Sequence, residues 1–456
     1  MLIEKSGGPE AASFADFDLS GADTVIAAVS GGSDSTALLL LLREHLMRNA
    51  PRCRLVAVTI DHALRPGSER EAEAVAKLCG GLGVAHRTLV WAGPKPATGI
   101  AAAARAARYR FLDKAARLEG ASIVITGHTA DDQAETVTMR GQRGEGIGSA
   151  GMAPLTLIFG RTWLARPLLG CRRHFLRDEL TRRGIGWIDD PTNDNQRFER
   201  PRLRATLSHS PHDFSQAIST AAEAARRRIA LGEAAAALLA QRADQPSPGL
   251  IRLDPALTNP RQSAADREAA VHLLRVLLAC IGGVAYLPDH ERMQALLDTL
   301  ATGGHGKPVR ATLSRCVADR RAAGLFLLRE TRSLPSPRPA TTGIWDGRFR
   351  LRTDDGLAGA TVAPLGADAV EPAKAYASET APESLVRAAL CAQPALRDTA
   401  GRLIEAGSDN GFEPVLAPWA GFLPGFDLTI AAKLGALLGT KPLPAVPWHE
   451  ADACKA

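Results

Sequence analysis

The stretch Ser30-Gly31-Gly32-Ser33-Asp34-Ser35 decides the fold of the first part of the chain. Residues 24–29 before it form an apolar run that predicts a strand buried on both faces. Residues 35–47 after it are rich in leucine and predict a helix. Two glycines let the backbone approach a ligand, and hydroxyls beside the free amides of a helix N-terminus form an anion site. The stretch therefore predicts a phosphate-binding turn.

The chemistry of this turn is not that of the most common phosphate loop. It lacks the lysine of the Gly-Lys-Ser/Thr loop, which excludes that class of NTPase. Asp34 lies among donors that favour phosphate, so its carboxylate predicts a divalent metal between itself and the phosphates. A simple tight turn between strand and helix explains the two glycines equally well when they are taken alone.

Composition limits the class of protein. A chain of 456 residues predicts two or three domains. No apolar run is suited to crossing a bilayer, and residues 1–5 lack the apolar core of a signal peptide, so we expect a cytoplasmic protein without a membrane partner. The 7 cysteines are scattered without a C-x-x-C pair, which predicts reduced thiols and neither a disulfide framework nor a zinc or iron–sulfur site. The net charge of +6 permits a polyanionic partner.

The pattern from residue 24 to residue 126 alternates between strands and helices. Further strands are predicted at 55–60, 87–91 and 121–126, and helices at 69–78 and 99–119. This alternation predicts an α/β fold with a doubly wound parallel sheet. Ligands of such sheets lie at the carboxyl ends of the strands, so polar residues that follow the strands should meet at one edge.

Polar residues do follow three of these strands. The serine/glycine turn follows the first strand, Asp61-His62 follows the second, and the segment from His128 to Glu135 follows the fourth. Each residue has an ordinary explanation, since Asp61 or Asp131 can cap a turn or helix and a loop histidine is common. Their joint occurrence at three strand ends favours a functional site.

Two later segments are unusual in composition. Residues 139–152 hold many glycines and charges, which predicts neither helix nor strand but a binding loop, a mobile lid or a plain linker. Arginine dominates from 161 to 204, with a helix predicted at 172–183. Guanidinium groups suit RNA phosphates, and the arginines at 197–204 lack neighbouring acids, which favours RNA over a solvated helix face. The arginines of this segment are Arg161, Arg166, Arg172, Arg173, Arg177, Arg182, Arg183, Arg197, Arg200, Arg202 and Arg204.

The pattern divides the chain into five segments. Residues 1–210 form the predicted nucleotide-binding catalytic domain, 211–245 a connecting helix and 246–330 a mainly helical domain with a hairpin at 309–328. The stretch 245–249 is expected to break the chain. Residues 331–341 form a Pro-rich linker, and 342–456 a small α+β domain.

Several motifs together resemble one family. The turn at 30–35 resembles the pyrophosphatase-loop (PP-loop) signature of enzymes that adenylate a carbonyl oxygen with ATP. The motifs at 60–66 and 127–136, Arg105 and Arg108-Tyr109, the 140–151 loop and Asp190-Pro191-Thr192-Asn193 look like the tRNA(Ile)-lysidine synthetase family. The resemblance covers about the first two hundred residues. The C-terminal region lacks the Lys/Arg-rich pattern of many members, which leaves open how the acceptor stem is held.

The resemblance implies an adenine-nucleotide α-hydrolase-like fold and a two-step ligation. The C2 oxygen of the wobble cytidine in the CAU anticodon of tRNA(Ile) attacks the α-phosphate of ATP, and pyrophosphate leaves. The amine of free L-lysine then attacks C2 and expels AMP, which leaves lysidine and converts AUG reading to AUA reading. The implied cofactors are ATP and Mg²⁺, and the sequence is compatible with a homodimer.

The resemblance also implies roles for single residues. The turn holds the phosphates, Asp34 holds Mg²⁺, and Asp132 and Glu135 recognise the lysine, with one of them the candidate base. The candidates for catalysis are Asp34, Asp132, Glu135, His128 and Arg108; those for the nucleotide are Ser30, Gly31, Gly32, Ser33, Asp34, Ser35, Asp61 and His62. The candidates for tRNA are Arg140, Arg143, Arg200, Arg202 and Arg204. The resemblance further implies that the domain at 246–330 binds tRNA and that the domain at 342–456 contacts it.

Other functions remain as alternatives. A PP-loop enzyme that thiolates a tRNA base would need a cysteine pair or cluster, which the chain lacks. A small-molecule ligase of the GMP or NAD synthetase type would leave the arginines at 161–204 unexplained. A non-catalytic RNA-binding protein would not need the acidic residues. The sequence leaves open the oligomeric state, the identity of the base and the rejection of the methionine tRNA with the same anticodon.

Overall fold

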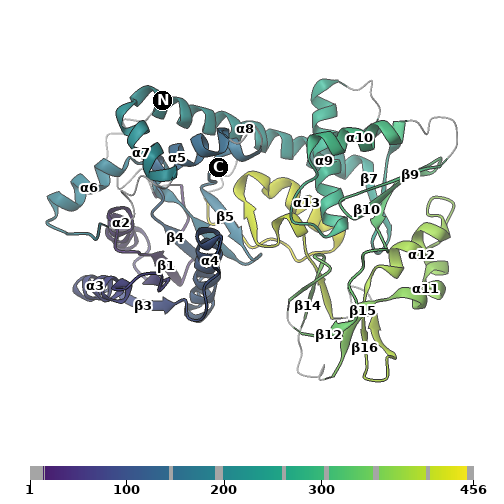
Figure 1. Ribbon diagram of the computed structural model, residues 1–456, viewed down its shortest axis with the longest axis horizontal. Helices are drawn as coiled ribbons and strands as arrows, with labels where there is room; N and C mark the ends of the chain where they lie inside the picture. Colours follow the sequence, from purple (N-terminus) through teal and green to yellow (C-terminus); the bar gives the residue numbers. More distant parts are fainter. Residues whose placement is uncertain are drawn as a thin grey trace. The chain divides into compact units, whose positions relative to one another are not determined.

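The computed structural model describes residues 14, 16–142, 147–189, 199–258, 263–301, 308–341, 343–352, 359–406 and 411–448 (Figure 1). They form two compact units. The first consists of Met1–Arg228, Phe422–Phe426 and Pro444–Ala456, and the second of Ile229–Gly421 and Asp427–Leu443. Arg143 and the segment 190–193, both named in the sequence analysis, lie outside the described residues.

A seven-stranded sheet forms the centre of the first unit, in the order β19-β5-β6-β4-β1-β2-β3. Five neighbouring strands run parallel, and β5 and β19 run antiparallel at one edge. The strands are β1 (Thr24–Ala28), β2 (Arg54–Asp61), β3 (Ala85–Val90), β4 (Ile123–Thr126), β5 (Leu155–Ile158), β6 (Thr162–Ala165) and β19 (Phe422–Pro424). The four strands predicted between residues 24 and 126 are confirmed.

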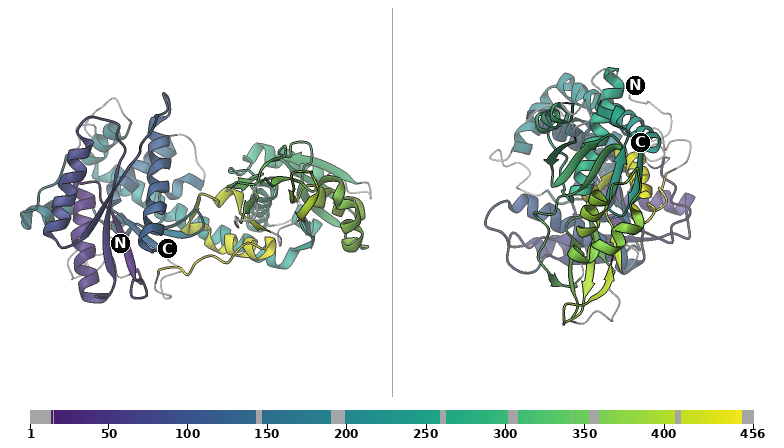
Figure 2. Two further views of the ribbon diagram at one scale, coloured as in Figure 1. Left: turned by 90° about the horizontal axis from the view of Figure 1, so that it is seen from below. Right: turned by 90° about the vertical axis from the view of Figure 1, so that its right-hand side faces the viewer.

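Helices cover both faces of this sheet. Helices α2 and α3 lie on one side and α4 on the other (Figure 1, Figure 2), which confirms the doubly wound class. The helices are α2 (Ser33–Asn49), α3 (Ser68–Gly81), α4 (Ile100–Glu119) and α5 (Ala130–Gly141). Tyr109 and Leu112 of α4 pack with Ile26 and Val124 of the sheet in one buried cluster. Burying a leucine of this kind stabilises the fold by about 1.5–3 kcal/mol.

The antiparallel edge was not predicted. Strand β19 comes from residues more than two hundred positions after β5, its hydrogen-bonded neighbour. The ring of Phe422 meets that of Tyr109 edge-on, with centroids 4.7 Å apart. Local sequence carries no signal for this pairing, because it depends on a segment that returns to the first unit after the chain has formed most of the second.

Three helices follow the sheet along the chain: α6 (Arg173–Arg182), α7 (Glu199–His209) and α8 (Pro211–Arg242). The predicted helix at 172–183 is confirmed as α6. The segment 139–152 is not wholly irregular, since Met139–Gly141 belongs to α5 and Ile147–Ala150 forms a short 3-10 helix. Arg200, Arg202 and Arg204 lie on α7.

The second unit contains more sheet than expected. The predicted helices are present as α9 and α10, but the prediction of a mainly helical middle segment is incomplete, because a five-stranded antiparallel sheet accompanies them. The stretch 245–249, expected to break the chain, instead contains the end of β7, and only Pro248-Gly249 form the turn of the hairpin between β7 and β8. Gly249 in the left-handed region (φ +76°) makes this tight turn. The elements here are β7 (Ala243–Ser247), β8 (Leu250–Leu253), α9 (Ala264–Gly282), α10 (His290–Ala301), β9 (Val309–Leu313), β10 (Cys316–Arg321) and β11 (Gly324–Arg329).

The remainder of the second unit holds two small sheets and short helices. The sheets have the orders β12-β15-β16-β17 and β13-β14-β18. Their strands are β12 (Arg338–Pro339), β13 (Ile344–Trp345), β14 (Phe349–Leu351), β15 (Thr361–Pro364), β16 (Pro394–Arg397), β17 (Leu403–Ala406) and β18 (Phe412–Pro414), and the helices are α11 (Val370–Tyr376), α12 (Glu383–Cys391) and α13 (Leu428–Leu438). Among the described residues, no helix is both long and apolar enough to span a membrane.

Candidate active site

A cavity of about 580 Å³ opens at the carboxyl ends of the parallel strands of the first unit. In chain order, β2 and β3 follow on one side of β1, and β4 lies on its other side. The border between β1 and β4 is therefore the topological switch point, where such sheets bind ligands. The cavity is lined by Ala28, Val29, Ser30, Gly32, Ser33, Asp34, Ser35, Val58, Ile60, Arg108, Tyr109, Leu112, Thr126, Gly127, His128, Asp132, Arg173, Arg177, Ile188, Asp189, Arg200 and Arg204.

The turn between β1 and α2 is held by its own hydrogen bonds. The Ser35 hydroxyl accepts from the Ser30 amide at 3.1 Å and donates to the Gly32 carbonyl at 3.1 Å. Gly31 has φ +88°, and a Cβ there would lie 2.7 Å from Cδ1 of Ile188. Helix α2 therefore begins with its free amides fixed toward the cavity, the arrangement that binds phosphate.

Gly127 brings the end of β4 against this turn. A Cβ at this position would lie 2.8 Å from the carbonyl oxygen of Asp34 and 3.1 Å from Cα of Ser35. Both neighbours are backbone atoms and cannot give way as a flexible side chain would. The glycine thus sets the spacing between the phosphate turn and the residues that follow β4.

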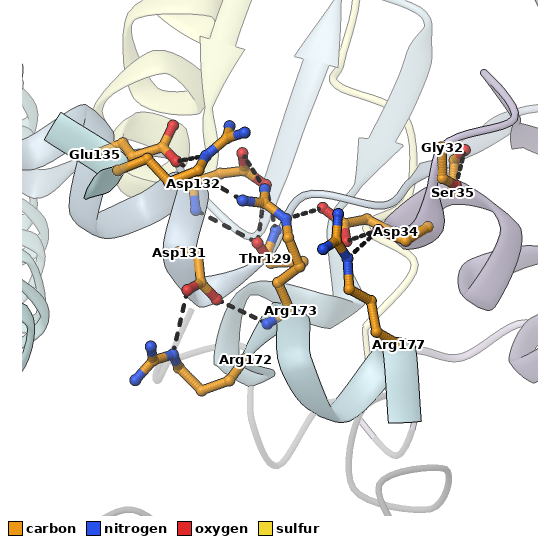
Figure 3. A network of polar contacts seen from close by, with 12 residues as sticks. Gly32, Asp34, Ser35, Thr129, Asp131, Asp132, Glu135, Arg172, Arg173 and Arg177 are labelled. Carbon is orange, nitrogen blue, oxygen red and sulfur yellow. Dashed lines mark hydrogen bonds and ion pairs between the residues drawn. The ribbon is translucent and has the colours of Figure 1, made fainter. Parts of the chain in front are cut away.

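Three predicted acidic residues meet at one arginine, which we call the Arg173 cluster: Asp34, Asp132, Glu135 and Arg173 (Figure 3). The Arg173 Nε donates to Oδ2 of Asp34 at 2.8 Å, and Nη2 donates to Oδ1 of Asp132 at 3.1 Å. The Nη1 lies 3.8 Å from Oε1 of Glu135. Glu135 does not line the cavity; it is buried behind Arg173 and also accepts from Nε of Arg204 at 2.8 Å.

The first turn of α5 explains how Asp132 is oriented. Thr129 caps the helix, with Asp132 accepting from the Thr129 amide at 2.9 Å in a capping box. Asp131, considered as a cap in the sequence analysis, instead accepts from the Arg173 amide at 2.7 Å. Asp132 and Glu135 stand three residues apart and lie on one face of the helix.

Two carboxyl groups of the Arg173 cluster, those of Asp34 and Asp132, have pKa values shifted in opposite directions. Burial, together with the nearby Asp132 carboxylate, raises the pKa of Asp34 against the opposing effect of Arg173. Burial would also raise the pKa of Asp132, but the positive charge of Arg173 and the Thr129 hydrogen bonds outweigh it and hold that pKa below its ordinary value. Asp132 therefore stays ionised, whereas Asp34 gains a proton more readily.

His128 and Arg108 present different chemistry to the cavity. Burial lowers the pKa of His128, and the positive charges of Arg166 and Arg108 add to this effect while Asp132 opposes it. The imidazole is therefore neutral near pH 7, and its Nδ1 lies 2.9 Å from the Thr126 hydroxyl. Burial also lowers the pKa of Arg108, and no described carboxylate forms an ion pair with this guanidinium. An unpaired cation facing the cavity favours an anionic ligand.

Asp61 and His62, predicted to bind the nucleotide, do not line the cavity. Asp61 accepts from the amide of Ala63 at 2.7 Å and so holds a tight turn in which Ala63 has φ +48°. The His62 ring meets Trp91 edge-on at 6.0 Å. Ile60, which precedes them, does line the cavity.

The arginines predicted to bind tRNA have different surroundings. Arg140 donates to the carbonyls of Gly148 and Gly151 at 3.0 and 2.8 Å, and so fixes the end of the glycine-rich loop. Arg200 and Arg204 line the cavity, and Arg202 is exposed. The expectation that the arginines at 197–204 lack acidic partners is wrong for Arg204, because its partner Glu135 is 69 positions away in the sequence.

The sequence analysis missed the position of Arg173. It appeared there only as one of eleven arginines suited to RNA, and nothing in the local sequence separates it from Arg172 or Arg177. Arg166 was likewise placed in that group, yet it is buried and donates to the Ala153 carbonyl at 2.6 Å and to the Thr156 hydroxyl at 2.9 Å. Their surroundings follow from the docking of α6 and β6, which local sequence does not encode.

Known proteins with similar sequences carry consistent names. Residues 10–210 match the family model of the PP-loop domain. The tRNA(Ile)-lysidine synthase of Mesorhizobium japonicum is 51% identical over 94% of this chain and 95% of its own length. That of Rhizobium meliloti is 38% identical over 93% and 94%, respectively. The solved structure of the U34-tRNA thiolase NcsA from Methanococcus maripaludis with its 4Fe-4S cluster has a TM-score of 0.40 and 15% identity, covering 46% of this chain and 75% of that chain.

The family resemblance expected from the motifs is therefore confirmed, and it extends well beyond the first two hundred residues, over nearly the whole chain. The cavity at the switch point, with its phosphate turn, lies inside the segment that matches the PP-loop domain. The chain belongs to the tRNA(Ile)-lysidine synthase family.

Proposed function

We propose that this chain joins the side-chain amine of free L-lysine to C2 of the wobble cytidine in the CAU anticodon of tRNA(Ile), with ATP consumed to AMP and pyrophosphate. The observation that carries the proposal is that a phosphate turn and the carboxylates of Asp34 and Asp132 line one cavity, with Glu135 buried next to them in the Arg173 cluster. The turn suits the triphosphate, and the carboxylates suit the ammonium group of lysine. The names of the relatives support the same reaction.

The cavity offers separate surfaces for the parts of ATP. Val58, Ile60 and Leu112 provide an apolar wall suited to a nucleotide base. The amides and hydroxyls at 30–35 suit the phosphates, and Arg108 supplies a positive charge without a carboxylate partner in the described part of the chain. Donors held in place before the reaction stabilise the charge that develops as pyrophosphate leaves.

The residues present fit a Mg²⁺ ion at Asp34. Its carboxylate lies at the phosphate turn, and hard oxygen ligands are those that Mg²⁺ prefers. No group of three metal-binding side chains occurs among the described residues, so the remaining ligands would be phosphates and water, as is common for this ion. When bound, Mg²⁺ neutralises charge on the phosphates.

Asp132 and Glu135 suit the ammonium group of lysine. Among the described residues, Oε2 of Glu135 is buried without a hydrogen-bond partner, which costs about 1–3 kcal/mol and favours a ligand that donates a hydrogen bond. The amine must lose a proton before it attacks C2, and a carboxylate in contact with it can accept that proton. Neutral His128 lies beside Asp132 and contacts the same cavity.

The wobble base must leave its stack to reach this cavity. Arg200 and Arg204 at the cavity and Arg202 on the exposed side of α7 are the proposed contacts to the anticodon backbone, together with Arg143 of the glycine-rich loop. Arg140 supports that loop through its bonds to Gly148 and Gly151.

The sequence is also compatible with a homodimer. A measurement of the mass of the protein in solution tests this oligomeric state.

The decisive experiment measures incorporation of labelled lysine into transcripts of isoleucine and methionine tRNAs that carry the CAU anticodon, with ATP and Mg²⁺. We expect labelling of the isoleucine transcript only and a loss of at least about 100-fold in Asp34→Ala. Release of pyrophosphate without lysine transfer would contradict lysine as the nucleophile. Tight tRNA binding without ATP consumption would support the RNA-binding alternative. The thiolase alternative is not favoured, because relatives over nearly the full length are named lysidine synthases.

A further inference from the structure

Arg173 forms bonds to all three carboxylates that the proposed function assigns to ligands. Its Nε contacts Asp34, the proposed metal ligand, at 2.8 Å. Its two Nη atoms contact Asp132 and Glu135, the proposed lysine ligands, at 3.1 and 3.8 Å. Figure 3 shows the guanidinium between the Asp34 and Asp132 side chains. One side chain therefore occupies both the metal site and the lysine site.

The backbone of Arg173 is fixed, whereas its side chain is the part that can move. The Arg173 amide donates to Oδ2 of Asp131 at 2.7 Å, and the Cys171 carbonyl accepts from the Ala130 amide at 2.9 Å. Nε of Arg172 holds the other carboxylate oxygen of Asp131 at 3.3 Å. The start of α6 is thus bonded to the start of α5. An arginine side chain has several rotatable bonds and can exchange partners without a backbone change.

The Arg173 cluster holds more carboxylates than guanidinium groups. Three carboxylates face two guanidinium groups, those of Arg173 and Arg204. Among the described residues, Oε2 of Glu135 is buried and has no hydrogen-bond partner. An unsatisfied buried oxygen is costly, so this position favours a further donor. The ammonium group of lysine is such a donor.

We propose that Arg173 is an internal counter-ion that couples the metal–nucleotide site to the lysine site. In the free protein its guanidinium holds the carboxylates that Mg²⁺ and the ammonium group of lysine require. Binding of Mg²⁺ with nucleotide at Asp34 removes one of its partners and adds phosphate oxygens, which suit the planar guanidinium. Arg173 then turns toward the phosphates and releases Asp132 and Glu135 for lysine. This inference rests on the proposed function, and Arg173 is in it a positioning residue.

A neighbouring arginine supports the proposed movement. Arg177, one helical turn after Arg173, already reaches the phosphate turn, where its Nε lies 3.3 Å from the Ser33 hydroxyl. Both residues line the cavity from the same helix. A guanidinium from this face of α6 can therefore contact the turn that the phosphates would occupy.

The test measures binding of L-lysine to the full chain by calorimetry, without tRNA. The nucleotide is α,β-methylene-ATP, which keeps the phosphates but cannot release pyrophosphate. In the unmodified chain we expect Mg²⁺ with this nucleotide to tighten lysine binding about tenfold, a usual size for coupling between sites. The nucleotide with EDTA in place of Mg²⁺ should not tighten it. The same factor must appear in nucleotide binding when lysine is added first.

Variants separate coupling from structure. Arg173→Met removes the counter-ion, so lysine should bind equally well with and without Mg²⁺ and nucleotide. Arg173→Lys keeps the charge and should keep part of the coupling. Arg182→Met is the matched control, because Arg182 lies on the same helix but is exposed and pairs with Glu179 at 2.6 Å; its coupling should equal that of the unmodified chain. Thermal unfolding verifies that each variant is folded.

The outcomes are distinct. Equal lysine affinity with and without Mg²⁺ and nucleotide in the unmodified chain, alongside normal lysine incorporation into tRNA, would overturn the inference and leave the proposed function intact. Coupling that survives in folded Arg173→Met would also overturn it. If Arg173→Met does not fold, the unmodified chain and Arg173→Lys decide. Lysine that neither binds nor becomes incorporated under any condition would overturn the proposed function, and the inference with it.

Discussion

The two units each contain an ion cluster, and the clusters have opposite compositions. In the first unit one arginine, Arg173, faces three carboxylates. In the second unit one carboxylate, Asp346, faces three arginines: Arg315, Arg329 and Arg348. Asp346 accepts from Nη2 of Arg329 at 3.0 Å and from Nε of Arg348 at 2.8 Å.

The difference lies in how the remaining polar groups are satisfied. The guanidinium of Arg329 also donates to the Ser333 carbonyl at 2.8 Å, and that of Arg348 donates to the Ala392 carbonyl. Burial lowers the pKa of Arg348 to about 10, and the Asp346 charge opposes this shift. The Arg173 cluster instead borders a cavity, and within the described part of the chain Oε2 of Glu135 has no hydrogen-bond partner. Buried arginines bonded to backbone carbonyls suit a structural cluster, whereas a cluster beside a cavity suits the proposed exchange of partners.

The largest expected effect is the loss of the Asp346 charge. Asp346→Asn leaves buried Arg329 and Arg348 without a counter-ion, which should cost about 3–5 kcal/mol in the free energy of unfolding. Urea unfolding followed by circular dichroism measures this. The control is Glu371→Gln, since Glu371 is exposed and pairs only with exposed Lys374 among the described residues, at 2.9 Å, so its loss should have little effect. Equal losses in both variants would contradict the assignment of a structural cluster.

The second prediction concerns the spacing beneath the Arg173 cluster. Gly127→Ala places a Cβ 2.8 Å from the Asp34 carbonyl oxygen, so the start of α2 must shift. Strain of this kind costs about 1–3 kcal/mol and should weaken nucleotide binding as well. Gly141→Ala is the control, because no atom of the described residues lies within 4 Å of its Cβ position and its φ is outside the left-handed region. Titration with a fluorescent nucleotide and urea unfolding measure the two effects; unchanged nucleotide affinity would contradict the close approach.

The third prediction concerns the pH dependence of stability at His128, whose pKa is affected by Asp132 of the Arg173 cluster. The folded state lowers the pKa of His128, so below about pH 6.5 the unfolded chain takes up a proton that the folded chain refuses. Stability is therefore lost as pH falls from 6.5 toward the folded pKa, by up to about 1.4 kcal/mol per pH unit. His128→Asn should flatten this part of the profile relative to the unmodified chain. Urea unfolding at pH 7.0, 6.0 and 5.0 makes the comparison, and parallel profiles would refute a neutral His128.

The smallest effect is expected at a surface cluster. The hydrogen bond from Arg182 has the largest effect on the pKa of Glu179 and lowers it. Burial opposes this shift, but Arg183 adds to the lowering, and the pKa falls to about 2. Because the folded pKa is depressed, the stabilisation is present above about pH 4.5 and is lost as pH falls toward 2. Glu179→Gln should therefore cost about 0.5–1 kcal/mol at pH 7 and nothing near pH 2. A loss that persists at pH 2 would indicate a packing effect instead.

Much of the first unit could be predicted because its signals are local. The apolar runs before Ser30, Asp61 and Gly127 are strand-length and bounded by turn residues, so β1, β2 and β4 were found close to their observed bounds. Parallel strands joined by helices have one favoured arrangement, and this places the residues after β1 and β4 at the same edge. Asp34, His128 and Asp132 therefore line one cavity, as the strand-end argument expected.

The α/β class, the phosphate turn at 30–35 and the family could be predicted from the amino-acid sequence, because each depends on residues that are close together in the chain. Three features could be found only in the folded chain: Arg173 rather than another arginine contacts the three carboxylates, Glu135 pairs with Arg204, and β19 completes the sheet. These pairings join residues far apart in the chain. Their partners depend on how each helix is rotated and docked, and that is set by the packing of the whole unit, so no local pattern specifies them.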